Sequence, residues 1–338
     1  MNLDKKDEKQ LFNLLSDSTL SNTYELEALF KKSGKKDIDR ETWERIFHTL
    51  KKTNGLRRID VNPTLEVYLE NNNVRVSIIG NNNINKYKKT NDLNIIESDC
   101  LQIMKKKIAF DESGKKITTL MLSDYDVKIK LRSETIIESD NAYFQKLKDE
   151  WKSFKKFFRF KTRYTFVDKD NLFSFDLSII KNSSKDNNQF IYYKKVSESA
   201  VFSNPQDYEV ELEFIGNKEN KYSKIELQSV YTQFLSNIEL IIKIIQRSKY
   251  ILSNSQRESL LENYCQVICQ KNLDPLIRSK LEHKGHGGIG PKVVSLEMKN
   301  IFVHEKEILN KYFKSTQVPS IRLDYCVTEK TDGDRQFL

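Results

Sequence analysis

Carboxylates recur at alternate positions in two segments of the sequence. Glu25 and Glu27 flank a leucine, and three glutamates alternate with apolar residues across 208–214. Alternate side chains of a strand share one face and lie about 6–7 Å apart, so each segment presents a row of acids. Like charges in one row repel each other. A divalent cation such as Mg²⁺ or Mn²⁺, which prefers oxygen ligands, would offset that repulsion.

Other segments carry only positive charge on their polar face. The basic positions that alternate with apolar, aromatic or threonine residues are Lys128, Lys130 and Arg132, and Arg159, Lys161 and Arg163; Arg75 shares a face with Ser77. Such rows suit the oxygens of a polyphosphate. A sheet with one wet face also alternates in this way, but a wet face usually mixes signs. We therefore expect acidic and basic rows to face each other across a barrel, around a metal-bound triphosphate.

Short strands are the elements that must position these rows. Over residues 64–216 the segments are short, alternating and rich in Val, Ile, Tyr, Phe and Thr. Turn residues separate them at 71–73, 81–83, 111–114, 168–171 and 181–188, and a helix over about 142–157 interrupts them. This texture is typical of an antiparallel sandwich or barrel.

Amphipathic helices flank the strands. Helical spacing of apolar residues predicts helices over about 8–15, 41–50 and 225–251, and 24–30 reads as a strand. Ser255 and Glu258 have the spacing of a capping box that opens a further helix to about residue 270. These helices can cover the apolar outer faces of the strands.

The acidic and basic rows together resemble the triphosphate tunnel metalloenzymes, in particular the RNA 5′-triphosphatases of viral and fungal mRNA capping. The resemblance covers roughly 10–245 and implies an α+β fold: an antiparallel eight-stranded β-barrel, the triphosphate tunnel, with flanking helices. It implies Mg²⁺ or Mn²⁺ on Glu25, Glu27 and Glu213, with Glu209 and Glu211 positioning the attacking water or pairing with basic side chains. The phosphate-binding residues that it implies are Arg75, Lys128, Lys130, Arg159, Lys161 and Arg163.

Two points of this resemblance depend on the tertiary structure. The family often has a basic residue two positions after the first glutamate pair, where this chain has Leu29. One phosphate contact is therefore in doubt. Lys105, Lys106 and Lys107 are consecutive, so the sequence leaves open which of them faces inward.

The C-terminal residues carry a second motif. Lys330-Thr-Asp332-Gly333, followed by Arg335, stands after a short apolar segment. It resembles the Lys-x-Asp-Gly signature of capping guanylyltransferases and ATP-dependent ligases. The resemblance implies that Lys330 attacks the nucleotide α-phosphate, while Asp332, Gly333 and Arg335 bind the nucleotide. We expect a triphosphatase domain at 1–250, and at 251–338 a helical linker with the start of a guanylyltransferase domain.

Only eight residues follow Lys330, so we expect the chain to be part of a longer capping enzyme of a large DNA virus. The expected partners are 5′-triphosphate RNA, GTP for the complete guanylyltransferase, and a cap methyltransferase domain or subunit, with no membrane. Four cysteines without a disulfide pattern, an N-terminus without a signal and the lack of a long apolar run favour an intracellular, soluble protein, in a virion or a cytoplasmic viral factory.

The net charge of +9, with a pI near 9.0, favours polyanionic partners but names none. Three alternatives therefore stay open. The same barrel could hydrolyse nucleoside triphosphates or inorganic polyphosphate, because a fold does not determine a substrate. A basic barrel could bind RNA without catalysis, although the acidic rows would repel RNA. The motif at Lys330 could also belong to a ligase.

Overall fold

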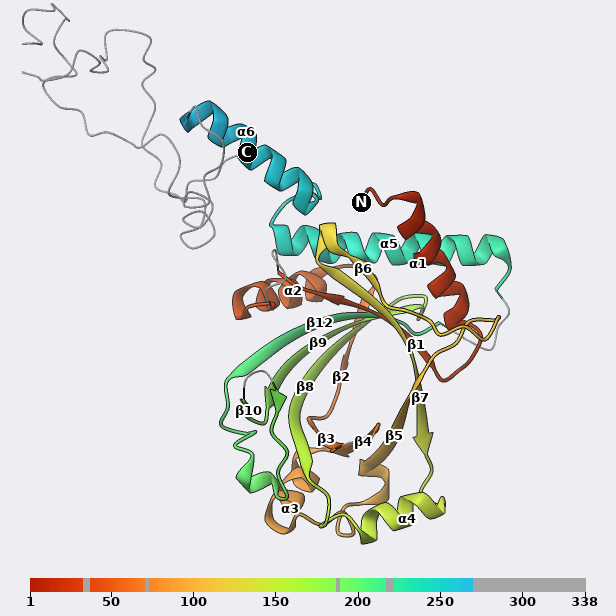
Figure 1. Ribbon diagram of the computed structural model, residues 1–338, viewed down its shortest axis with the longest axis vertical. Coiled ribbons are helices and arrows are strands. Elements are labelled where there is room, and N and C mark those ends of the chain that lie inside the picture. The colour runs from red at the N-terminus through yellow and green to blue at the C-terminus, as the bar shows by residue number, and fades with distance from the viewer. Residues whose placement is uncertain (33–36, 71–72, 187–188, 217–221, 270–338) are drawn as a thin grey trace, which may run out of the picture. The chain divides into compact units, whose positions relative to one another are not determined.

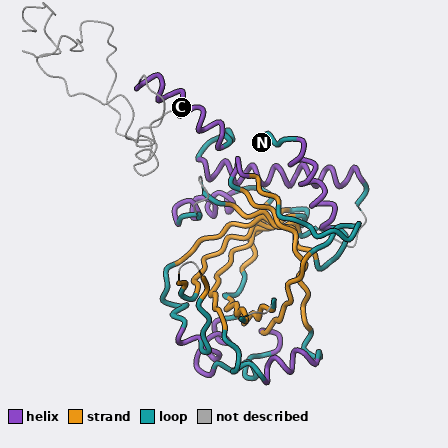
Figure 2. Tube along the Cα trace, viewed as in Figure 1, coloured by secondary structure: helices purple, strands orange, loops and turns teal. Residues whose placement is uncertain are grey.

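Eight antiparallel strands form a closed barrel, which confirms the expected fold (Figures 1 and 2). The computed structural model describes residues 1–32, 37–70, 73–186, 189–216 and 222–269. The strands follow the order β1-β12-β9-β8-β3-β4-β5-β7, and β7 pairs back with β1 to close the ring. Their bounds are β1 Tyr24–Phe30, β3 Thr64–Leu69, β4 Val74–Ile79, β5 Leu101–Ile108, β7 Val127–Ile137, β8 Lys156–Asp168, β9 Phe173–Asn182 and β12 Gln206–Phe214.

Smaller strands lie outside this ring. The strand β2 (Leu56–Asp60) pairs with β8, and β6 (Leu120–Leu122) pairs with β7. The strands β10 (Lys185–Asp186) and β11 (Gln189–Phe190) form a separate hairpin. The segment 181–188 is therefore not a simple turn, because β9 continues to Asn182 before the hairpin begins.

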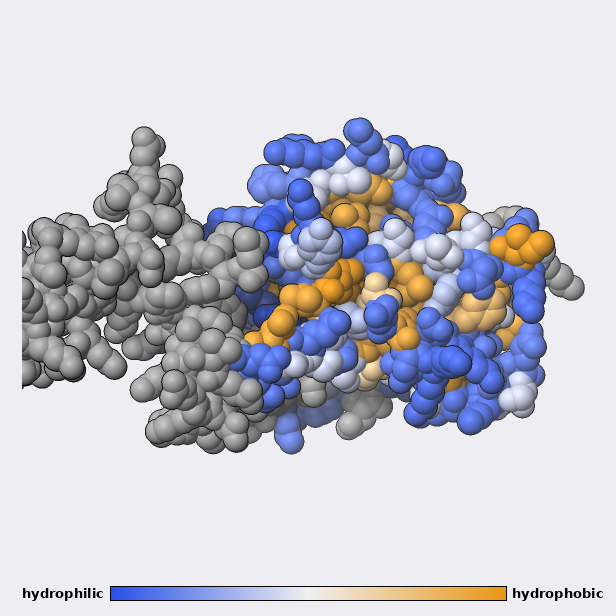
Figure 3. Space-filling model, turned by 90° about the horizontal axis from the view of Figure 1, so that it is seen from above, coloured by the Kyte–Doolittle hydropathy of each residue, from blue (hydrophilic) through white to orange (hydrophobic). Residues whose placement is uncertain are grey.

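The apolar faces of the strands point outward into two hydrophobic cores. Helices α1 (Lys5–Ser18), α2 (Arg40–Lys52) and α5 (Lys224–Gln246) cover one side of the barrel, and α3 (Asn81–Thr90) and α4 (Ala142–Asp149) cover the other (Figure 1). Because the cores lie outside the barrel, the alternate polar side chains of each strand must point into its interior. The face seen in Figure 3 is mainly hydrophilic, with hydrophobic side chains between the polar ones.

Side-chain caps determine where the main helices begin. The carboxylates of Asp4 and Asp39 accept hydrogen bonds from first-turn amides of α1 and α2, and Ser223 forms a capping box with Glu226 at the start of α5. Among the described residues, no helix is long and apolar enough to cross a membrane.

Three further local predictions were wrong. Residues 81–83 begin α3 and form no turn, because Ile84 and Tyr87 bury one face of that helix in the second core; such packing overrides the weak helix propensity of asparagine. The helix expected over 142–157 ends at Asp149, and β8 begins at Lys156.

The third correction concerns the last helix. The capping box there joins Ser253 to Gln256, not Ser255 to Glu258, and it opens α6 (Asn254–Cys269). By compactness the chain divides into Met1–Arg257 and Glu258–Leu338, and the whole barrel belongs to the first unit.

One buried carboxylate ties the β8–β9 turn to α5. Asp168 accepts hydrogen bonds from the amides of Leu172 (2.8 Å) and Phe173 (3.2 Å), and from the side chain of Gln233 (2.8 Å). We expect Asp168→Ala to lower the free energy of unfolding by about 1–3 kcal/mol, because it leaves buried donors unpaired. Urea denaturation measures this, with the exposed Asp170→Ala in the same turn as the matched control. Equal losses in both variants would contradict this role.

Candidate active site

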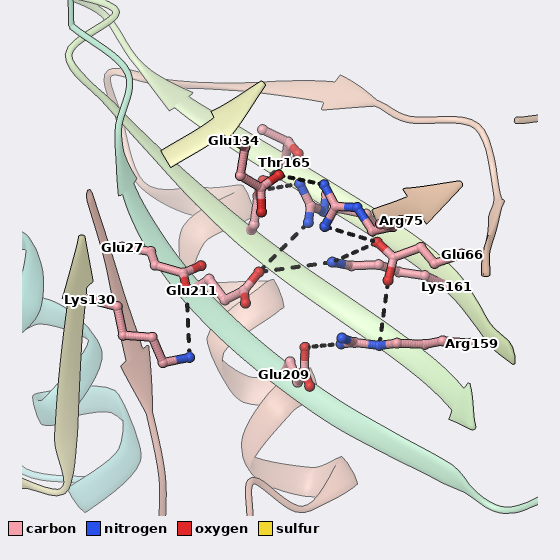
Figure 4. A network of polar contacts seen from close by, with 12 residues as sticks. Glu27, Glu66, Arg75, Lys130, Glu134, Arg159, Lys161, Thr165, Glu209 and Glu211 are labelled. Atoms are coloured by element: carbon pink, nitrogen blue, oxygen red, sulfur yellow. Dashed lines mark hydrogen bonds and ion pairs between the residues drawn. The ribbon is translucent and has the colours of Figure 1, made fainter. Parts of the chain in front are cut away.

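The barrel interior is lined by charged side chains of both signs. Alternation with the outward-facing core residues places the predicted acids and bases on the inner face, together with charged residues that the sequence did not single out for this site. The inward-facing acids are Glu25, Glu27, Glu66, Glu134, Asp176, Glu209, Glu211 and Glu213, and the inward-facing bases are Arg75, Lys106, Lys128, Lys130, Arg132, Arg159, Lys161 and Arg163. Figure 4 shows that many of them point toward one another.

Glu66 lies at the centre of one cluster. Its carboxylate is 3.9 Å from Arg75, 3.8 Å from Arg159 and 4.0 Å from Lys161 (Figure 4). It also accepts a 2.9 Å hydrogen bond from the hydroxyl of Tyr68. Burial alone would raise the pKa of Glu66, but these partners outweigh burial and lower it to about 2. Burial lowers the pKa of Lys161 from its ordinary value, although Glu66 is close. The cluster therefore holds one buried and two half-buried cations around one buried anion.

Glu134 pairs with Arg75 of this cluster and joins one further cation, Lys106, to it. It accepts a 2.7 Å hydrogen bond from Arg75 and lies 2.8 Å from the ammonium group of Lys106. Lys106 is thus the inward-facing member of the three consecutive lysines, whereas Lys105 and Lys107 are exposed. Sequence reasoning missed Glu66 and Glu134, because each is a single acid in its strand. The residues on either side of each acid are the apolar or small residues of the opposite strand face, so alternation along the strand would have placed both acids on the inner face.

A second cluster surrounds Glu211. Arg163 forms an ion pair with Asp176 at 2.7 Å and lies 3.7 Å from Glu211, which is also 4.0 Å from Lys161. Burial alone would raise the pKa of Glu211, but Lys161, Arg163 and Arg159 together lower it below its ordinary value. Glu211 is therefore an ionised carboxylate, able to accept hydrogen bonds from a water molecule. Glu209 forms an ion pair with Arg159, in line with the second role expected for it.

The predicted metal ligands lie on neighbouring strands. Glu27 stands opposite Glu213 in the β1–β12 pairing, and Glu25 is two positions from Glu27 on the same face. Among the residues that the structure describes, no three acidic, histidine or cysteine side chains converge closely enough to hold a metal ion as placed. Glu27 instead lies 3.6 Å from Lys130.

The chemistry of these carboxylates nevertheless suits a divalent cation. Burial, and then the nearby charge of Glu211, raise the pKa of Glu27. A cation beside Glu27 would oppose both effects. Hard oxygen donors from two adjacent strands are also what Mg²⁺ and Mn²⁺ prefer. The residues therefore fit the metal by type and register, and their side chains would have to turn to bind it.

Buried donors in the interior wall lack hydrogen-bond partners. Among the described residues, the Nε atoms of Arg75 and Arg159 and the hydroxyl of Ser178 have no hydrogen bond. Ser178 stands between Arg163 and Glu209 in register. An unpaired buried polar group costs about 1–3 kcal/mol. Oxygens of an anionic ligand could accept from these donors.

Some predicted residues stay outside these clusters. Leu29 faces the interior between Lys128 and Glu211 in register, so this position offers no charge to a phosphate. Lys128 is inward-facing but makes no ion pair with the residues that are described. The motif residues Lys330, Asp332, Gly333 and Arg335 lie outside the described part of the chain.

Several solved structures are similar to this chain. One mimivirus capping enzyme triphosphatase is 18% identical, with 71% of this chain and 99% of that chain covered and a TM-score of 0.48. A mimivirus RNA triphosphatase domain is 20% identical, with 72% and 100% covered and a TM-score of 0.47. The S. pombe Pct1 RNA triphosphatase is 13% identical, with 71% and 94% covered and a TM-score of 0.43. No protein-family model and no curated protein matches the sequence.

Proposed function

We propose that the chain is a metal-dependent RNA 5′-triphosphatase, which removes the γ-phosphate of 5′-triphosphate RNA as the first step of mRNA capping. One observation carries the proposal: buried cations line a closed barrel beside buried carboxylates. The side chain of Lys161 is only 7% exposed and that of Arg75 only 17%. A wet sheet face would leave such groups in water, because burying a charge is costly without a partner. A polyanion with a divalent cation matches both sets of charges.

Each set of residues has a distinct part in this reaction. Arg75, Arg159 and Lys161 bind phosphate oxygens, and Arg163 binds those nearest to Glu211. The ionised Glu211 accepts a hydrogen bond from water and orients its oxygen toward the γ-phosphorus. Water adds to phosphorus as the bond to the bridging oxygen breaks, so the products are diphosphate RNA and inorganic phosphate. A divalent cation on Glu25, Glu27 and Glu213 would neutralise charge on the transferred group.

The C-terminal motif supports the assignment to capping. Lys330 and the residues around it match a guanylyltransferase signature, so we propose that 251–338 contains the start of such a domain, which would use GTP. Removal of the γ-phosphate and transfer of a nucleotide onto the resulting diphosphate end are consecutive reactions. This link favours RNA over free nucleotides or polyphosphate as the substrate. A methyltransferase partner and an intracellular place of action stay part of the same proposal.

Phosphate release from RNA labelled at the γ-position tests the proposal. We expect the full chain to release labelled phosphate only when Mg²⁺ or Mn²⁺ is present, and to prefer 5′-triphosphate RNA over ATP at equal concentration. A preference for ATP or tripolyphosphate would favour the hydrolase alternative. Salt-sensitive RNA binding by a folded chain without phosphate release would favour the non-catalytic binding module.

A further inference from the structure

Four aromatic residues gather beside the row of inward-facing cations. The ring of Phe157 is 4.1 Å from that of Phe190, 6.3 Å from that of Tyr68 and 6.5 Å from that of Tyr192, between centroids. We call these four residues the aromatic collar. Phe157 is buried, at 4% exposure, but Phe190 is 49% exposed. The collar therefore has a buried base and a large aromatic surface that faces water.

Register places the collar directly beside the cations. Phe157 is two positions before Arg159 on the inner face of β8, a spacing of about 6–7 Å. Tyr68, on β3, stands opposite Phe157 of β8 and opposite Arg75 of β4, and its hydroxyl donates to Glu66. Tyr68 therefore contacts both the cation cluster, through Glu66, and the collar, through Phe157.

The type of inward-facing side chain changes from one end of the barrel interior to the other. Along β8 the inner face runs from Phe157 through Arg159 and Lys161 to Arg163, which lies against Glu211. Glu213, opposite Glu27, is the next inward-facing residue on β12. From β8 to β12 the wall therefore changes from aromatic to cationic to acidic, with Glu66 among the cations and Lys130 beside Glu27 at the acidic end. A triphosphate whose γ-phosphate lies at the acidic end directs its nucleoside toward the collar.

We infer that the aromatic collar binds the first nucleobase of the RNA by stacking. The inference rests on the proposed function, because the bound triphosphate sets the place of the nucleoside. Aromatic side chains stack on any base, so the collar would accept all four nucleotides at this position. It gives the site a chemical reason to distinguish RNA from inorganic polyphosphate, which has no base. Phe190 is the member whose exposed ring the base would cover.

A fluorescent base at the first position tests this stacking. We measure binding of 5′-triphosphate RNA that carries 2-aminopurine as its first base to the full chain, without divalent metal so that no turnover occurs. Stacking quenches 2-aminopurine, so we expect quenching with the native chain and its loss in Phe190→Ala. The dissociation constant of the variant for this RNA should be at least about 5-fold higher than that of the native chain, as expected for the loss of one stacked base.

Two comparisons separate stacking from general damage. Tyr250→Ala removes another exposed aromatic ring (79% exposed) and should bind and quench as the native chain does. Competition by inorganic tripolyphosphate reports the phosphate site alone, so the loss in Phe190→Ala should be larger for RNA than for tripolyphosphate. Equal losses for both ligands, or unchanged quenching, would overturn the inference. The fluorescence experiment measures binding and needs no turnover. If the native chain bound and quenched this RNA but released no phosphate with metal present, the proposed function would be wrong and the stacking inference would not.

Discussion

Glu213→Gln is expected to reduce metal-dependent phosphate release by more than about 100-fold. A bound divalent cation stabilises the transition state by several kcal/mol, and each 1.4 kcal/mol corresponds to a factor of about ten. The amide keeps the size of the side chain but loses the charge that holds the cation. Single-turnover release of labelled γ-phosphate measures the effect over a titration of Mn²⁺. We expect Glu27→Gln to behave in the same way, because Glu27 stands opposite Glu213.

Glu211→Gln separates the two roles of the acidic row. If Glu211 orients water and does not hold the metal, its variant should lose turnover while the Mn²⁺ concentration needed for half-maximal rate stays near the native value. The exposed Glu70→Gln serves as the matched control with native activity. Native activity in folded Glu213→Gln would remove the metal site from the proposal.

Glu66→Gln is expected to lower the free energy of unfolding at pH 7 by about 3 kcal/mol. The pKa of Glu66 is about 2 in the folded chain, against an ordinary value of 4.5; each pKa unit corresponds to about 1.4 kcal/mol. As the pH falls, the unfolded chain takes up this proton first. The stabilisation by Glu66 is therefore complete above about pH 4.5 and is lost as the pH falls toward 2.

Urea denaturation of the native chain and Glu66→Gln at pH 7, 4 and 3 measures this difference. The difference in free energy of unfolding between the two proteins should be largest at pH 7 and smaller at pH 3, because glutamine resembles a protonated glutamate. Glu70→Gln changes an exposed residue directly after the same strand, and it should have the free energy of unfolding of the native chain at each pH. If the difference in free energy of unfolding does not change with pH, Glu66 stabilises the chain through packing and not through its charge.

The alternation of residue types predicted an antiparallel sandwich or barrel with charged strand faces, and the resemblance to the triphosphate tunnel metalloenzymes favoured the closed barrel. Strand phase is a local property, because successive side chains point to opposite faces. The alternation therefore placed Glu211 and Arg163 on the polar faces of their strands, and these faces line the interior of the closed barrel. The beginning of α3 at residue 81 was not predictable in this way, since its buried face depends on the core it meets.

Which charges meet was decided only by the tertiary structure. The sequence by itself determined the acidic and basic rows and the apolar faces, because these follow from local alternation. It could not show that Glu66 collects three cations from two other strands, or that Lys106 and not Lys105 turns inward to Glu134. Nor could it place Phe190 over Phe157 beside Arg159. The charge contacts join residues on neighbouring strands, and only the pairing order and register of those strands bring them together.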